Sequence, residues 1–181
     1  FRTGYDAMLA KARKEGWWIL WAGLLKVCAT SDQFNREILD LVKNRDLSEQ
    51  EIQRRLLLLT GVARELNFPG FGLAQVKPLA DGTVLVLFER FPHLVRGAFK
   101  LHIVFSYGNS YPKTIDRFLD AGEEDLLDYL ASRAATRLSS WFAKDALVAA
   151  EKLSSYYENL RQKPEEFSRR AANVLGQIPA F

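Results

Sequence analysis

The sequence predicts an α+β fold: N-terminal helices, a central antiparallel β-meander of three or possibly four strands, and C-terminal helices packed on the sheet. Three observations predict it. Apolar residues recur at helical spacing on both sides of the central third of the chain. Within that third, residues 83–91 and 99–107 carry strand-like apolar patterns. The pair Asp81-Gly82, typical of a tight hairpin turn, precedes the first of them. Helices in this order pack on one face of an antiparallel sheet.

Length and composition are those of one ordinary soluble domain. The 181 residues are 48% hydrophobic, 12% aromatic and 26% charged, which excludes disorder and a disulfide scaffold. A chain of this length buries about 70% of its unfolded surface, which favours one core over two. We expect a single domain over 1–181, with an N-terminal helical extension (1–46), a core of one helix and the meander (47–119), and C-terminal helices (120–181). The chain begins on Phe1 rather than Met, as expected of a fragment or a processed product.

Two helices are expected before residue 30. The first has apolar residues at helical spacing and ends at Gly16; these residues are Tyr5, Met8, Leu9 and Ala12. The run 17–29 is apolar except for Lys26 and contains three tryptophans. It is shorter than the about 20 residues that a membrane span needs, so we expect a buried helix and no transmembrane segment. A peripheral membrane contact through 17–29 is the alternative that the tryptophans leave open.

Two capping boxes begin the next helices. Thr30 with Gln33, and Ser48 with Glu51, have the spacing in which each side chain bonds the backbone of the other. The two apolar stripes that follow are Phe34, Ile38, Leu41 and Val42, then Ile52, Leu56, Leu59 and Val62. The stretch Asn67-Phe-Pro-Gly70 ends the second of these helices, because proline cannot continue it.

The strands are expected at 73–79, 83–91 and 99–107. Residues 84–88 are apolar at every position, so both faces of the second strand should be covered. The third strand alternates cleanly. Its predicted apolar face consists of Phe99, Leu101, Ile103, Phe105 and Tyr107.

The remainder is expected to be helical. Acidic residues 123–125 fit a helix start, where the helix dipole favours negative charge. Lys163-Pro164 separates the last helix from the one before it. The apolar stripes are Ile115, Phe118 and Leu119; Leu127, Leu130, Ala134, Leu138 and Trp141; Leu147, Ala150, Leu153, Tyr157 and Leu160; and Phe167, Ala171, Val174 and Leu175.

The central segment resembles the superfamily of ubiquitin-conjugating enzymes and RWD domains over residues 50–119. The residues that carry the resemblance are Gln53-Arg-Arg-Leu-Leu57, Phe68-Pro-Gly70, Pro78 to Val86, Gly97 to Phe105, and Tyr111-Pro112. The resemblance implies a helix, a meander of three or four strands, and a Tyr-Pro turn. No cysteine follows the meander, since Cys28 precedes it. A relative without the catalytic cysteine implies a docking role rather than catalysis.

No catalytic, metal-binding or cofactor-binding residues are predicted. His93 and His102 accompany no nucleophile motif and no metal-ligand spacing. Cys28 lies in an apolar run, so we expect a buried small side chain rather than a thiolate. A lone cysteine fits an intracellular location. No enzyme activity is therefore expected, although catalysis by scattered carboxylates remains an alternative.

Charge gives no sign of a dedicated nucleic-acid binder. The net charge is only +3 although the isoelectric point is about 9.0. Bases and acids are interspersed, and the basic clusters, including Arg169-Arg170, are expected to be solvated helix faces.

We therefore predict a non-catalytic protein-interaction or assembly module within a larger complex. Neighbouring aromatics on a helix diverge by about 100°, so some should be left for a partner. The candidate partner-binding residues are Trp17, Trp18, Trp21, Trp141, Phe142, Tyr156 and Tyr157.

Two other functions stay open. A nucleic-acid-binding module would use a basic strand face, whose residues are Arg90, Lys100, His102, Lys113 and Arg117. A carrier of a small apolar or lipid ligand would hold it between the meander and the helices.

Overall fold

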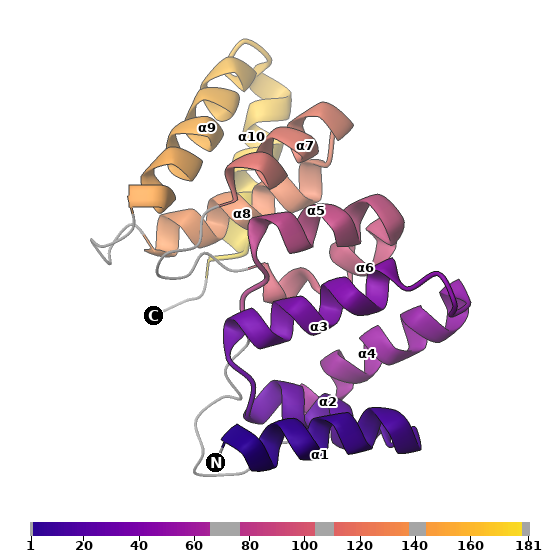
Figure 1. Cartoon of the computed structure of the whole chain (residues 1–181). Helices are drawn as coiled ribbons and strands as arrows, with labels where there is room; N and C mark the ends of the chain where they lie inside the picture. Colours follow the sequence, from indigo (N-terminus) through magenta and orange to yellow (C-terminus); the bar gives the residue numbers. More distant parts are fainter. Residues whose placement is uncertain (1, 66–76, 104–110, 138–143, 179–181) are drawn as a thin grey trace. The chain divides into compact units, whose positions relative to one another are not determined.

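The computed structural model describes residues 2–65, 77–103, 111–137 and 144–178, and over these residues the chain is helical without a β-strand (Figure 1). The predicted α+β class and antiparallel sheet are therefore wrong. The backbone contacts divide the chain into two compact units, Phe1–Lys77 and Pro78–Phe181. The expectation of a single domain over 1–181 stays a prediction.

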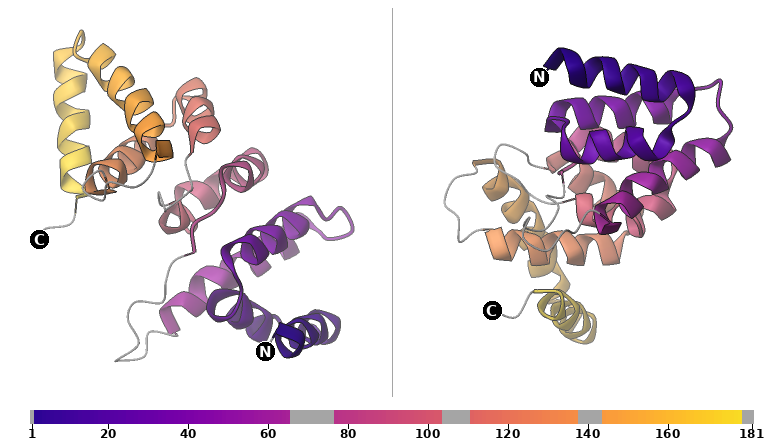
Figure 2. Two further views of the ribbon diagram at one scale, coloured as in Figure 1. Left: turned by 60° about the vertical axis from the view of Figure 1, so that its left-hand side comes forward. Right: turned by 90° about the horizontal axis from the view of Figure 1, so that it is seen from below.

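The described residues of the first unit form four helices, and α2 contacts each of the other three (Figures 1 and 2). They are α1 (Arg2–Glu15), α2 (Trp18–Val27), α3 (Ser31–Lys43) and α4 (Glu49–Glu65). The inner side of α2 is buried through Trp21, Ala22 and Leu25. All four helices were expected, α2 from its apolar run and the others from their apolar spacing.

Gly16 ends α1, as predicted. Its φ of 70° lies in the left-handed region, where a side chain would be strained. The Trp17 N–H donates to the Ala12 carbonyl at 2.9 Å, and the Gly16 N–H to that of Arg13 at 3.3 Å. These bonds satisfy two of the last carbonyls of α1 and turn the chain sharply into α2.

The Thr30 capping box of α3 is also confirmed, and the Ser48 box of α4 is confirmed for one of its two bonds. The Gln33 N–H donates to Thr30 Oγ1 at 3.2 Å, and the Gln33 side chain accepts from the Thr30 N–H at 2.9 Å. The Glu51 N–H donates to Ser48 Oγ at 3.2 Å. The predicted inner residues with described side chains are all buried: Phe34, Ile38, Leu41, Val42, Ile52, Leu56 and Leu59.

The second unit contains six α-helices and one 3₁₀ turn among the described residues. They are α5 (Asp81–Arg90), α6 (Pro92–Arg96), η1 (Lys100–His102), α7 (Pro112–Ala121), α8 (Glu124–Arg137), α9 (Lys144–Leu160) and α10 (Pro164–Gly176). Helix α8 contacts α7, α9 and α10, and α9 and α10 lie side by side (Figure 2). The acidic start of α8 and the start of α10 at Pro164 were both predicted.

The expected hairpin at Asp81-Gly82 is the start of helix α5. Both Asp81 carboxylate oxygens accept backbone N–H bonds from the start of α7, from Lys113 at 3.1 Å and Thr114 at 2.9 Å. The apolar run after it fits a helix equally well, because Val84, Leu87 and Phe88 recur at helical spacing and are buried. Short apolar runs do not distinguish strand from helix by periodicity.

The other two expected strands are corrected as far as the structure describes them. Residues 77–79 and 99–103 form no strand, and residues 73–76 and 104–107 lie outside the described residues. The predicted strand would have alternated buried and exposed side chains. In the 3₁₀ turn η1 the side chains instead recur every three residues, so Phe99 and His102 are buried on one side while Leu101 is exposed. The meander implied by the resemblance is thus absent from the described residues. The resemblance itself is not tested and stays a prediction.

Candidate functional site

The three tryptophans of the first unit have different environments. Trp17 is 48% exposed, Trp18 is half-buried, and Trp21 is only 2% exposed. The Trp21 Nε1–H donates to the Glu37 carboxylate at 3.3 Å, and Arg13 Nη1 contacts the same carboxylate at 2.6 Å. Trp21 is thus an internal anchor between α2 and α3. Trp17, at the N-cap of α2, is largely exposed, and the half-buried Trp18 contacts both Trp21 and Arg55.

A shallow apolar groove lies beside the first turn of α2. It encloses about 430 Å³, and its lining residues are Gly16, Trp17, Trp18, Ile19, Leu20, Arg54 and Leu58. Ile19 is 71% exposed and Leu20 is 40% exposed. Leu57, next to Leu58 on α4, is exposed as well. This surface, which we call the α2–α4 groove, combines two tryptophans with three aliphatic side chains and one arginine.

One cation lies near each tryptophan ring of the groove. The Arg55 guanidinium lies over the Trp18 ring, 3.5 Å from its centroid, and Lys11 Nζ lies 5.6 Å from the centroid of Trp17. Arg54 and Arg55 share one carboxylate, that of Glu51, at 3.2 and 2.9 Å. Hydrogen bonding from Arg55 holds the pKa of Glu51 below its usual range, so this carboxylate is fully charged at neutral pH.

The Tyr156–Tyr157 pair belongs to a polar network inside the second unit. The Tyr157 hydroxyl donates to Asp128 Oδ1, and Arg170 Nη1 donates to the Tyr156 hydroxyl at 2.9 Å. Arg170 Nε donates to both Asp128 oxygens at 2.9 Å, and the Asn173 amide donates to Oδ2 at 2.6 Å. The hydroxyl of each tyrosine in the predicted partner-binding pair therefore makes a hydrogen bond within the second unit.

Sequence reasoning missed this network. Arg170 was expected on a solvated helix face, but its side chain is completely buried. Its partner Asp128 is 42 residues away in the chain, so no local pattern joins them. On the helical wheel Asp128 lies well away from the apolar stripe of Leu127, Leu130 and Ala134, so the local sequence carries no signal of its burial.

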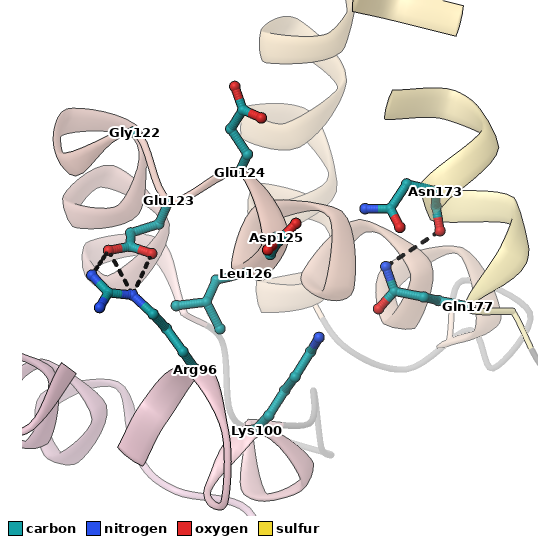
Figure 3. A pocket seen from close by; sticks show the side chains of 9 residues that line it. All are labelled: Arg96, Lys100, Gly122, Glu123, Glu124, Asp125, Leu126, Asn173 and Gln177. Atoms are coloured by element: carbon teal, nitrogen blue, oxygen red, sulfur yellow. Dashed lines mark hydrogen bonds and ion pairs between the residues drawn. The ribbon is translucent and has the colours of Figure 1, made fainter. Parts of the chain in front are cut away.

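A second, polar cavity of about 710 Å³ lies at the N-terminus of α8 (Figure 3). Its lining residues are Arg96, Lys100, Gly122, Glu123, Glu124, Asp125, Leu126, Asn173 and Gln177. Most of its charges are compensated: Arg96 forms a two-pronged ion pair with Glu123, and Glu124 lies 3.2 Å from Arg169 and 3.6 Å from Arg170. No group of three His, Cys, Asp or Glu side chains within the described ranges could hold a metal ion.

The candidate basic residues do not share a sheet face, since the described part of the chain has none. His102 is buried, with its ring 5.2 Å from that of Phe99. Arg117 pairs with Glu89, and Lys100 Nζ lies 4.9 Å from the Tyr129 ring centroid. Lys113 is exposed, and the Arg90 guanidinium lies 5.3 Å from the ring centroid of Phe91.

Three further expectations can be placed. Cys28, expected to be buried, is exposed at the end of α2. The run 17–29 forms the predicted helix, but Ile19, Leu20 and Val27 are exposed, so the helix is buried on its inner side only. Trp141 and Phe142 lie outside the described residues.

The internal contacts described above do not account for the α2–α4 groove, and comparison with known proteins gives it no role. The chain matches no protein-family model, no curated protein and no solved structure. Every helix in the described ranges is too short or too polar to cross a lipid bilayer.

Proposed function

We propose that this chain is a non-catalytic protein-binding module, one component of a larger assembly, and that a helix of its partner docks in the α2–α4 groove. The observation that carries the proposal is the outer side of α2. A helix of a folded domain normally places charged residues opposite its buried stripe. In α2 the only charged residue is Lys26, which is buried, while Ile19 and Leu20 are exposed.

The shape of the surface supports the same function. The two exposed aliphatic side chains adjoin a hollow that Trp17, Trp18 and Leu58 also line. Exposed apolar patches with tryptophan at their centre are typical of protein interfaces, and grooves between two helices commonly receive a third. Trp18 is held in place by its edge-to-face contact with Trp21, 5.9 Å between ring centroids, and by Arg55. A ring fixed in this way loses little conformational entropy when a partner binds.

Selection from a display library of helical peptides tests the proposal. The full chain serves as bait, and each selected peptide is then measured by fluorescence polarisation against Ile19→Glu. Ile19 is 71% exposed, so the free energy of unfolding of this variant should lie within about 0.5 kcal/mol of that of the original chain. We expect it to weaken binding at least about tenfold, because a buried charge would face the peptide.

The matched control is Leu175→Glu, which places the same charge at an equally exposed leucine on α10. It should leave peptide affinity unchanged. A library that yields no binder, or binders that tolerate Ile19→Glu as well as Leu175→Glu, would overturn the proposal that the groove is the docking site.

A further inference from the structure

We infer that the docked helix is acidic: an amphipathic segment whose apolar side chains enter the α2–α4 groove and whose carboxylates meet the basic residues beside it. This inference rests on the proposed function and adds the chemistry of the partner. The charges at the groove are the observation behind it. Three cations, Lys11, Arg54 and Arg55, line it or contact the rings that line it.

Those cations are incompletely neutralised. Among the described residues, Arg54 and Arg55 both pair with the one carboxylate of Glu51, so two positive charges meet one negative charge there. Lys11 Nζ lies over the Trp17 ring, which carries no net charge. The Arg54 side chain is 66% exposed and can meet an additional carboxylate without leaving the groove. A partner with negative charge at this position would satisfy the surplus.

The spacing along α4 specifies where that charge should fall. Arg54 and Leu58 both line the groove and are four residues apart, one helical turn. A helix that lies along α4 and places an apolar residue against Leu58 brings the residue one turn away beside Arg54. We therefore expect the partner segment to have Asp or Glu three or four residues from its apolar anchor.

The same residues argue against a nucleic acid. Sequence-tolerant binding of single strands uses tryptophan faces that are free to stack on bases. Here the Arg55 guanidinium covers a face of Trp18 at 3.5 Å, and Lys11 lies near Trp17. The surface between α2 and α4 is hollow, so it can receive a side chain of a partner. A membrane-binding surface would instead present protruding apolar residues that enter the lipid.

Two stapled helical peptides of about 18 residues test the inference. They carry the same leucine and phenylalanine stripe, one with glutamate and the other with lysine on the polar side. Fluorescence polarisation with the full chain should show the glutamate peptide binding about tenfold more tightly at low salt, the effect of a few exposed ion pairs. The preference should shrink as ionic strength rises from about 0.05 to about 0.5 M.

Charge-reversal variants locate the effect. Arg54→Glu should abolish or invert the preference for the glutamate peptide, whereas Arg36→Glu, an equally charged change at an exposed position of α3 outside the groove lining, should preserve it.

Equal binding of both peptides, with sensitivity to Ile19→Glu retained, would overturn the acidic partner and leave the docking site standing. Absence of groove-dependent binding by either peptide would overturn the docking site as well. Flotation with vesicles of phosphatidylcholine and phosphatidylserine provides the last arm: binding there, without binding of either peptide, would assign the groove to anionic membranes and overturn the inference.

Discussion

The Arg170 guanidinium and the Asp128 carboxylate form a buried ion pair between α10 and α8. Arg170 Nε lies 2.9 Å from both carboxylate oxygens, Nη2 lies 2.8 Å from Oδ1, and the two side chains are 0% and 1% exposed. Burial raises the pKa of Asp128, but hydrogen bonds from Arg170, Tyr157 and Asn173 outweigh it and hold that pKa below its usual range. The pair therefore stays ionised at neutral pH.

Removing one partner of this pair should destabilise the fold more than removing both. Asp128→Leu leaves the buried Arg170 guanidinium with only the partly exposed Glu124 carboxylate, 3.6 Å away, and removing one partner of a buried pair typically costs about 3–5 kcal/mol. The double variant Asp128→Leu with Arg170→Met removes both charges and should be more stable than Asp128→Leu alone. Urea unfolding followed by circular dichroism measures the original chain, Asp128→Leu, Arg170→Met and the double variant. Additive effects of the two substitutions would contradict the coupling.

The pH dependence follows from the sign of the Asp128 shift. Its folded pKa is lower than the unfolded value of about 3.9, so its stabilisation is present above that value and is lost as pH falls through the folded pKa. The stability difference between the original chain and Asp128→Leu should be constant between about pH 5 and 8 and shrink below about pH 4.

Helix positions before residue 66 could be predicted from the sequence because local signals agree there. The Thr30 capping box, the turn at Gly16 and the apolar stripe through Phe34 all concern residues within a few positions of one another. In the second unit the deciding contact is long-range: Asp81 accepts N–H bonds from Lys113 and Thr114, more than 30 residues later. No local pattern reveals it, so the hairpin signal at Asp81-Gly82 was misleading.

The candidate site was partly predictable for the same reason. Side-by-side tryptophans indicate that one of them diverges from the core, and Trp17 does so. The sequence does not show that Ile19 and Leu20 are left uncovered, because that depends on which side of α2 meets α1, α3 and α4. The internal role of Tyr156 depends on Arg170, another residue distant from the pattern that was analysed.

Replacing Gly82 tests the correction from hairpin to helix directly. In a tight hairpin turn Gly82 would need a positive φ, and alanine would be strained. In α5 its φ is not positive, and an added Cβ would meet no atom within 4 Å. Gly82→Ala should therefore raise the free energy of unfolding by about 0.5 kcal/mol. The control is Gly122→Ala, where φ is 66° and a loss of about 1–2 kcal/mol is expected. Thermal unfolding distinguishes the outcomes, and destabilisation by both substitutions would favour a turn at Gly82.

The tryptophans of α2 should separate into one residue that stabilises the fold and one that does not. Trp21 is buried and bonded to Glu37, so Trp21→Ala should reduce the free energy of unfolding by about 3–5 kcal/mol. Trp17 is half exposed, and Trp17→Ala should reduce it by less than about 1 kcal/mol while weakening peptide binding at the α2–α4 groove. Urea unfolding of the two variants measures the difference. Equal losses of stability would show that Trp17 belongs to the core.

Lys26 should destabilise the first unit at neutral pH. Its side chain is buried, its ammonium group makes no hydrogen bond, and the Phe34 ring centroid lies 5.7 Å from Nζ. Burial and the nearby charge of Lys77 lower the pKa of Lys26 to about 8. Since the unfolded value is about 10.4, the unfolded chain binds more protons between these values, and stability should rise as pH increases through that interval.

Lys26→Met should therefore stabilise the chain at pH 7, by about 1–2 kcal/mol after allowance for partial solvation of the amine. Its advantage should diminish near pH 10, where the amine of the original chain is neutral in the folded state. The control is Lys43→Met, at an exposed position of α3, which should change stability by less than about 0.5 kcal/mol at both pH values. Urea unfolding at the two pH values provides the comparison. A loss of stability in Lys26→Met that is the same at pH 7 and pH 10 would show that the ammonium group has a compensating partner in solution.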